Sequence, residues 1–319
     1  MAIDRDDDYP DRNERDDLPH RPRHRDDYDL PRDERKNGVA TAALVLGVLS
    51  LCGGLTAIPG LVCGVIGMSR ASSRGGVGFG MAIAGTVLSV VGMLMTIPLM
   101  IGLLLPAVQK VREAAARQAS NNNLKQISLA QHNYESANDS FPKPYHYQGP
   151  AGGEPEKPVD RLSWRVAMLP YLEQENLYKQ FRLGEPWNGA NNLPLSNQTV
   201  KALTHPADTP PSPDSRYRIF YGGGAAYDLN RPCSVITISD GLSNTIAVVE
   251  GGERVTWTQF NDYPFRKDGP LPMLGLPDAK VFQAALFDGS VRSFRKTIDP
   301  NVLKSAIHAS DGVGLPVGE

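Results

Sequence analysis

The residues best suited to chemistry are oxygen-bearing side chains between positions 240 and 257. The segment Asp240-Gly241-Leu242-Ser243-Asn244-Thr245 offers several oxygen ligands in one tight loop, and calcium binds oxygens of this kind. The loop lacks EF-hand ligand spacing, and an Asx-type turn that enters a strand predicts the same residues. Glu250 and Glu253 flank a Gly-Gly pair and, with Trp257, could line a saccharide-binding groove. A strand end with a turn also explains them.

Sequence signatures of catalysis are missing elsewhere. Gly222-Gly223-Gly224 is not followed by Lys-Ser/Thr, as a phosphate loop requires, and no Gly-x-Ser-x-Gly elbow occurs. Cys233 has no recognisable nucleophile signature around it. Four histidines after the apolar region show no metal-ligand spacing: His132, His146, His205 and His308. We therefore expect no enzyme, no cofactor and no resident metal ion.

Composition narrows the class of protein further. The chain has 319 residues, 33 Lys and Arg against 35 Asp and Glu, and a net charge of -2, which argues against a nucleic-acid partner. Two of its three cysteines, Cys52 and Cys63, lie in an apolar region, so Cys233 has no partner for a disulfide in the polar part.

The first 105 residues contain two segments of opposite character. Residues 1–37 are charged and broken by prolines, so they cannot bury enough apolar surface to fold and are expected to be a disordered tail. Residues 38–105 carry only Arg70 and Arg74 as charges. Since about 20 apolar residues span a bilayer, Val39–Met68 and Val77–Leu105 predict a two-helix transmembrane hairpin, with the lipid bilayer as its partner.

Glycines recur along both apolar runs, which suits two helices in close contact. The pattern of Ala42–Gly47, of Gly60–Met68 with Ser69-Arg70, and of Gly78–Gly85 resembles a bacterial two-span family called domain of unknown function 4190. The resemblance covers about 65 residues and implies an anchor in the inner membrane.

Two spans would place the tail and the C-terminal part on the same side of the membrane. Basic residues that flank the apolar region outnumber those in the short loop and favour the cytoplasm for both ends. They are Arg32, Arg35 and Lys36 before it, and Lys110, Arg112 and Arg117 after it. The family resemblance described next favours an external domain, so the orientation stays open, with the external side preferred.

Residues 106–142 predict an amphipathic connecting helix. Apolar side chains recur every three or four residues and define one stripe: Val108, Val111, Ala115, Ala119, Leu124, Ile127, Ala130 and Tyr134. Asn121-Asn122-Asn123 predicts a break, and Asn138-Asp139 with Pro142 predicts the end of the helix.

Several segments from Leu103 onward resemble the bacterial family domain of unknown function 1559, which also bears a solute-binding-protein-type label. They include Leu104–Gln109, Asn123-Leu124-Lys125-Gln126, Ser163–Val166, Asp240-Gly241-Leu242-Ser243-Asn244 and Asp288-Gly289. The resemblance implies a pseudopilin-like fold, in which a long helix supports a C-terminal domain outside the membrane.

Two positions depart from that family. The family's cleavage motif Gly-Phe-Thr-Leu-Ile-Glu would place its Phe at Gly85, where this chain has neither the Phe nor the following Glu. The hairpin therefore takes the place of a cleavable leader. A His that many members carry before the final Asp-Gly is Asp278 here.

The domain of residues 143–319 is expected to be α+β, with a long helix packed on a small antiparallel sheet. Expected strands are Tyr217–Tyr221, Ser234–Ile238, Thr245–Val249, Arg254–Phe260, Val281–Phe287 and Ser290–Phe294. Asp288-Gly289 predicts a type I′ hairpin turn, and Asp299-Pro300 opens a final helix.

These observations predict a membrane-anchored, non-enzymatic envelope protein with a structural or interaction role. Its partners would be other envelope proteins or copies of itself, contacted through the amphipathic helix. The alternative is a ligand-binding or sensor module for a saccharide or calcium, tethered to the membrane.

Overall fold

The computed structural model describes residues 37–51, 54–73, 75–150 and 157–315. The chain divides into two compact units, Met1–Pro106 and Ala107–Glu319. The expected disorder of the tail concerns residues 1–36, which lie outside the described residues. Helix α3 (Phe79–Asn138) contributes to both units.

The first apolar run folds as two helices, where the sequence had predicted one. Helix α1 (Gly38–Ser50) and helix α2 (Ala57–Ser73) are separated by a turn near Gly54. Gly54 takes φ +69 and its N–H donates to the Ser50 carbonyl at 2.8 Å. A side chain there would collide with Thr96 of α3, so both backbone and space require glycine.

Helix α1 runs in the same direction as α3. Near its start, a Cβ added to Gly78, the residue before α3, would lie 3.3 Å from the Ala40 Cβ. At its other end, Ser50 lies against Gly92 of α3, and its hydroxyl donates to the Leu88 carbonyl at 3.2 Å.

Helix α2 runs the opposite way. Its early residue Gly60 lies against Ser89 of α3, whereas its later residue Gly67 lies against Ala82, one or two turns nearer the start of α3. Asn37 joins the ends at this side, because its amide donates to the Gly67 carbonyl at 3.2 Å. The chain therefore enters unit 1 beside the start of α3.

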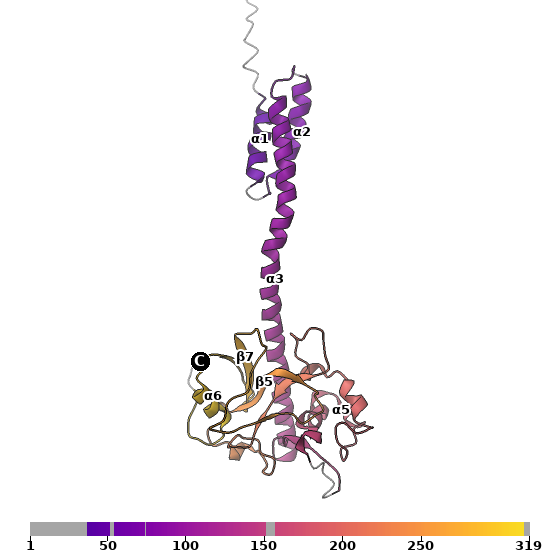
Figure 1. The fold of residues 1–319 in the computed structure, drawn as a ribbon, viewed down its shortest axis with the longest axis vertical. Coiled ribbons are helices and arrows are strands. Elements are labelled where there is room, and N and C mark those ends of the chain that lie inside the picture. Colours follow the sequence, from indigo (N-terminus) through magenta and orange to yellow (C-terminus); the bar gives the residue numbers. More distant parts are fainter. Residues whose placement is uncertain (1–36, 52–53, 74, 151–156, 316–319) are drawn as a thin grey trace, which may run out of the picture. The chain divides into compact units, whose positions relative to one another are not determined.

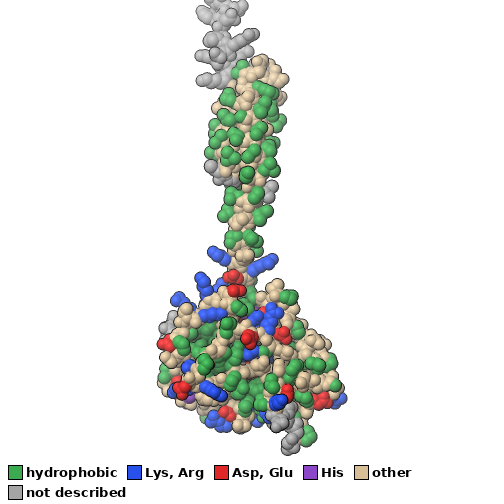
Figure 2. Space-filling view, in the orientation of Figure 1, with side chains coloured by type: hydrophobic (Ala, Val, Ile, Leu, Met, Phe, Trp, Pro, Cys, Tyr) green, Lys and Arg blue, Asp and Glu red, His purple; other side chains and the backbone are tan. Residues whose placement is uncertain are grey.

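The packing of unit 1 is inverted relative to a soluble bundle. The residues that α1 and α2 bury are all Ala, Gly or Ser: Ala40, Ala43, Gly47, Ser50, Ala57, Gly60, Gly64, Gly67 and Ala71. Large side chains point outward, such as Leu55 at 91 % and Ile58 at 67 % exposure. Figure 2 shows this apolar coat on the face in view. Small residues inside and large apolar ones outside are typical of helices that associate in lipid.

Among the described residues, one helix, α3, is long and apolar enough to cross a membrane. Helix α1 has 13 residues and α2 has 17, so at 1.5 Å per residue they are about 20 and 26 Å long. Both are shorter than the roughly 30 Å hydrocarbon core of a bilayer.

Unit 2 contains a four-stranded antiparallel sheet in the order β3-β5-β7-β8. Its strands are β3 (Ser215–Arg218), β5 (Ile246–Val255), β7 (Val281–Leu286) and β8 (Val291–Arg295). Two small pairs accompany it, β1 (Tyr145–His146) with β2 (Leu162–Ser163), antiparallel, and β4 (Phe220–Tyr221) with β6 (Tyr263–Pro264), parallel. The α+β class with a long helix and small antiparallel sheets is confirmed.

Helix α3 packs into unit 2 through part of its predicted stripe. Leu124, Ile127 and Ala130 are fully buried, whereas Val108 and Val111 are 46 % and 68 % exposed. The expected break at residues 121–123 is wrong, since the helix continues to Asn138. It ends there because Asp139 takes φ +56.

Helices lie against the sheet's two hydrophobic cores (Figure 1). One core joins Leu124 and Ile127 of α3 with Ala285 and Phe287. The other joins Phe282 and Phe294 with helix α6 (Pro300–Ile307). The Asp299 side chain caps α6 by accepting from Asn301 N–H at 2.8 Å, as the sequence predicts.

Short helical turns connect these elements. They are η2 (Pro158–Asp160), α4 (Trp164–Ala167), η3 (Leu169–Leu172), α5 (Glu175–Tyr178), η4 (Leu193–Asn197), η5 (Lys201–Leu203) and η6 (Val235–Thr237). The strand expected at 234–238 is wrong, because a capping box between Ser234 and Thr237 closes η6. The strands expected at 245–249 and 254–260 form one strand, β5, which ends at Val255.

The hairpin turn between β7 and β8 exists but is not type I′. Gly289 takes φ +84, and its N–H donates to the Leu286 carbonyl at 3.0 Å. A type I′ turn needs positive φ at both central residues. Among described residues other than glycine, Asp139 and Glu173 alone have positive φ, so a turn with Asp288 at a central position is not type I′. A type I turn followed by a left-handed glycine describes it.

Close backbone contact in unit 1 gives a first prediction. A Cβ added to Gly85 would lie 2.5 Å from Ala43 C, whereas one at Gly80, on the same helix, meets nothing within 4 Å. We expect Gly85→Leu to destabilise unit 1 by about 1–3 kcal/mol, and Gly80→Leu to have a much smaller effect. Unfolding of the detergent-purified protein by SDS, followed by helical circular dichroism, measures both. Equal effects would contradict this packing.

A second prediction concerns the core of unit 2. Leu124→Ala should cost about 2–5 kcal/mol, since it leaves a cavity in a fully buried site. Leu129, 62 % exposed on the same helix, is the matched control, and Leu129→Ala should stay within about 0.5 kcal/mol. All three tryptophans lie in unit 2, so urea unfolding followed by tryptophan fluorescence reports on it. Reversed effects would show that the other face of α3 is buried.

Candidate functional site

A buried carboxylate, Glu250 on β5, stands at the centre of the candidate site. It is 6 % exposed. Its Oε1 accepts from the Ser120 hydroxyl of α3 and from His205 Nε2 at 3.2 Å. Its Oε2 accepts from the Gln283 N–H of β7 at 2.8 Å. Helix, sheet and the loop after η5 therefore meet at one carboxylate.

The hydrogen bonds continue into α3 and β3. The Tyr217 hydroxyl lies 2.9 Å from Ser120 Oγ and accepts from the Asn123 amide at 3.3 Å. Asn123 also donates to the Thr204 carbonyl at 2.9 Å. Burial raises the pKa of Tyr217 well above its usual value, so the phenol stays neutral. Ser120, Asn123, Tyr217, His205 and Glu250 together form what we call the Glu250 network.

The tautomer of His205 follows from its neighbours. Its Nδ1 accepts from the Ala207 N–H at 3.2 Å, so its proton resides on Nε2 and is donated to Glu250. The following Asp208 accepts from Arg216 Nε at 2.8 Å and from Arg254 Nε at 3.1 Å. These ion pairs hold the loop that carries His205 against the sheet.

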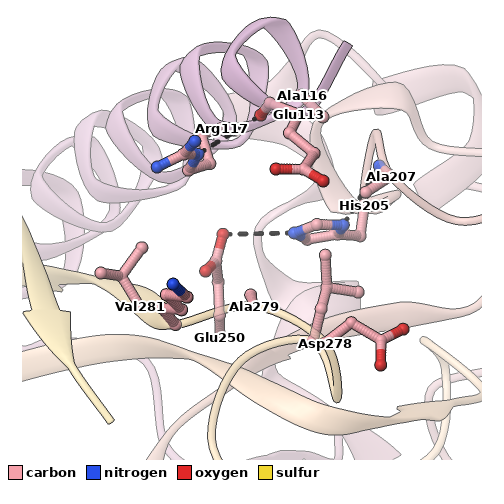
Figure 3. A pocket seen from close by; sticks show the side chains of 11 residues that line it. Glu113, Ala116, Arg117, His205, Ala207, Glu250, Asp278, Ala279 and Val281 are labelled. Atoms are coloured by element: carbon pink, nitrogen blue, oxygen red, sulfur yellow. Dashed lines mark hydrogen bonds and ion pairs between the residues drawn. The ribbon is translucent and has the colours of Figure 1, made fainter. Parts of the chain in front are cut away.

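A cavity of about 310 Å³ opens beside this network. It is lined by Glu113, Ala116, Arg117, His205, Ala207, Glu250, Leu276, Asp278, Ala279, Lys280 and Val281. Figure 3 shows the Glu113 carboxylate pointing into the space above His205 and Glu250. The volume lies at the lower end of the range for small-molecule sites.

The described residues around the cavity offer hydrogen-bonding groups. The Ser120 hydroxyl donates to the Glu250 carboxylate and not to His205, so these two residues do not form the Ser–His pair that activates many catalytic serines. Burial raises the pKa of Cys233 to about 12, which keeps it a neutral thiol.

The predicted motif residues of α3 separate into different roles. Asn123 belongs to the Glu250 network, and Leu124 to the hydrophobic core. Lys125 and Gln126 are exposed on the opposite side of the helix.

The predicted oxygen-rich loop does not reach the cavity. Asp240 accepts from the backbone N–H of Asp311 at 2.6 Å and of Gly312 at 2.8 Å. Asn244 donates to the Asp240 carbonyl at 2.9 Å, and Gly241 takes φ +94. Ser243 is exposed. The Asp240 side chain thus pins the segment after α6.

Among the described residues, one group of His, Cys, Asp and Glu side chains has ligand atoms close enough together to hold a metal ion. It consists of Asp240, His308 and Asp311. Hydrogen bonds within the chain already occupy both Asp240 oxygens and the His308 Nδ1, which accepts from Ser310 N–H at 3.1 Å.

The other motif positions serve the fold. Asp288 accepts from Ser290 N–H at 2.8 Å and, with Gly289, forms the β7–β8 turn. Trp257 is fully buried and donates to the Ser196 and Gln198 carbonyls at 3.1 and 3.0 Å. It therefore does not line a saccharide groove.

Sequence reasoning named Glu250 as a possible groove residue but missed its partners, because they are distant in the chain. His205 and Glu250 are 45 positions apart, and Ser120 is 130 positions from Glu250. One signal was present: Ser120 and Asn123 interrupt the apolar stripe on the face that continues into Leu124 and Ile127. Polar side chains on a buried face need partners.

The architecture defines a class before any comparison: an α+β domain with a small polar cavity, preceded by a glycine-rich apolar helical unit. Residues 109–232 match the family model described as Protein of unknown function (DUF1559). Residues 39–99 match the model described as Domain of unknown function (DUF4190). Both resemblances are confirmed, in the expected order. Comparisons with curated proteins and with solved structures gave no match.

The scattered histidines yield a pH prediction. Burial lowers the pKa of His146 to about 4, and its Nε2 lies 3.1 Å from the Tyr178 hydroxyl. Because the unfolded chain binds the proton more readily, stability is fully present above pH 6.5 and is lost as pH falls toward 4. The loss reaches about 3 kcal/mol.

His146→Gln removes the titration while retaining a hydrogen-bonding side chain. Urea unfolding between pH 7 and pH 4.5 should therefore show a smaller loss of stability for this variant than for the wild-type protein. Parallel pH profiles would contradict the burial of a neutral His146.

Proposed function

We propose that this chain is a membrane-anchored, non-enzymatic protein that displays unit 2 on the external side of the inner membrane. The observation that carries the proposal is the course of the chain through unit 1. It enters beside the start of α3, where Asn37 contacts Gly67, and leaves at the far end of α3's apolar part, at Pro106.

This course supports an odd number of membrane crossings. If α1 and α2 form a re-entrant pair, α3 crosses alone; if all three helices cross, there are three crossings. Either number is odd, so the tail and unit 2 lie on opposite sides. The two-span hairpin predicted from the sequence gives an even number of crossings, which would place the tail and unit 2 on the same side of the membrane. Our proposal of an odd number replaces that prediction.

The distribution of basic residues then indicates a side. With the α2–α3 connection on the tail side, that side collects five basic residues near the membrane: Arg32, Arg35, Lys36, Arg70 and Arg74. The opposite side has Lys110, Arg112 and Arg117. Since the richer side stays in the cytoplasm, the tail is cytoplasmic and unit 2 is external. With two spans, the count of basic residues favours a cytoplasmic unit 2 and the family resemblance favours an external one. With an odd number of spans, both favour an external unit 2.

A structural or interaction role is supported by what unit 2 contains. The packing of α3 on an antiparallel sheet suits a pseudopilin-like domain, and neither Ser120 nor Cys233 is set up as a nucleophile. Lateral contact with other copies through α3 would use its exposed residues, such as Val108 and Val111, because Leu124 and Ile127 are committed to the core.

The cavity beside Glu250 favours a second candidate, a tethered ligand-binding module. The model matched by residues 109–232 carries the label SBP_bac_10, of solute-binding-protein type, which is in keeping with this candidate. Both proposals use the same anchor and the same orientation.

The crossing parity predicts a labelling pattern in intact spheroplasts. In a background without native cysteines, a cysteine at exposed Ser136 in unit 2 should react with a membrane-impermeant maleimide. Cysteines at Ala2 in the tail and at Ser73 at the end of α2 should react only after permeabilisation.

Two spans predict a different pattern, with Ala2 and Ser136 alike and Ser73 opposite. That result would overturn the proposed topology. Denatured samples of each variant, labelled in parallel, control for expression and thiol reactivity.

A further inference from the structure

The Glu250 carboxylate is a buried anion without a permanent cation among the described residues. Its hydrogen-bond partners among these residues are a hydroxyl, a backbone N–H and the Nε2–H of a histidine. The His205 Nδ1 accepts from the Ala207 N–H, so Nε2 is the ring nitrogen that donates to Glu250. His205 is thus a hydrogen-bond donor to Glu250 and not a permanent cation.

Cationic side chains of the cavity wall do not neutralise Glu250. Arg117 and Lys280 line the cavity, but in the described part of the chain neither forms an ion pair with Glu250. Arg117 instead donates from Nε to the Glu113 carbonyl at 3.4 Å, and Figure 3 shows its guanidinium directed away from Glu250.

A second carboxylate faces the same space. Glu113 of α3 points into the cavity from the side opposite Glu250 (Figure 3). Two carboxylates that flank a small cavity attract a positive charge, and a buried charge is stabilised only when it is paired. Among the described residues, the ligand atoms that converge closely enough for a metal ion belong to Asp240, His308 and Asp311 and not to Glu113 or Glu250, so the cation proposed here is a hydrogen-bonding organic one.

We propose that the cavity binds a small molecule through a protonated amine, held between Glu250 and Glu113. An ammonium group donates three hydrogen bonds and can reach the lone pairs that Glu250 has left. The apolar wall of Leu276, Ala279 and Val281 accommodates a short carbon skeleton. A volume of 310 Å³ corresponds to about ten waters, so the ligand is of monosaccharide or short diamine size. This inference rests on the ligand-binding candidate above and adds the chemistry of its ligand.

Matched pairs of polar probes test the amine directly on the full chain in detergent. Glucosamine is compared with glucose, and 1,3-diaminopropane with 1,3-propanediol, by saturation-transfer NMR and titration. We expect binding of at least one amine, and at least tenfold weaker binding of its hydroxyl partner.

Two variants locate the binding. Glu250→Gln should weaken amine binding at least tenfold, while Glu253→Gln, exposed on the same strand, should not change it. Ala116→Leu enlarges a side chain of α3 that lines the cavity and lies outside the Glu250 network, and it should also abolish binding. Ala114→Leu, exposed on the same helix and outside the cavity lining, is its control. Tryptophan fluorescence melts identify any variant that fails to fold.

The results of these experiments distinguish the ammonium inference from the proposed function on which it rests. Equal binding of amine and hydroxyl probes, blocked by Ala116→Leu, would overturn the ammonium inference and leave a ligand-binding module. Absence of binding by every amine, or binding unaffected by both Glu250→Gln and Ala116→Leu, would overturn the inference as well. None of these results depends on the membrane topology, which the labelling experiment tests separately.

Discussion

The close contact of small residues in unit 1 is the constraint on which the rest of this protein depends. Gly47 and Gly85 bring α1 and α3 so close that a Cβ on either would collide with backbone atoms. Water could not drive this association, because the large apolar side chains, such as Val48 and Leu94, point outward. In lipid, where burial of such side chains gives no advantage, backbone proximity and packing hold helices together. The arrangement of α1 and α2 against α3, on which the proposed anchor and its topology rest, follows from it.

The single helix α3 links this anchor to a domain organised by the opposite rule. From Leu124 onward the same helix buries large apolar side chains against a sheet, as water-soluble proteins do. The side-chain pattern therefore reverses along one helix, with large apolar residues exposed in unit 1 and buried in unit 2. Ser120 and Asn123 lie where burial in unit 2 begins, and their polarity is satisfied by the Glu250 network.

Short sequence patterns correctly predicted the elements that are determined by residues adjacent in the chain. The α6 cap at Asp299, the end of α3 at Asp139 and the small-residue helix contacts follow from single residues or short periods. Predictions failed where tertiary contacts decided: Asn123 stays helical because Thr204 and Tyr217 pair with its amide. Of the site's interacting residues, Glu250 was named from the sequence as a groove residue, but its partners Ser120 and His205 come together with it only once the sheet has formed.

Solvent accessibility of the outward side chains in unit 1 tests the central claim most directly. Nitroxides placed singly at Val48, Ile58 and Leu94, one on each helix, report collisions with oxygen in lipid and with a nickel chelate in water. In reconstituted bilayers the account predicts that oxygen dominates at all three positions. Dominance of the nickel chelate at these sites would show that the large side chains face water, and the inverted bundle would be contradicted.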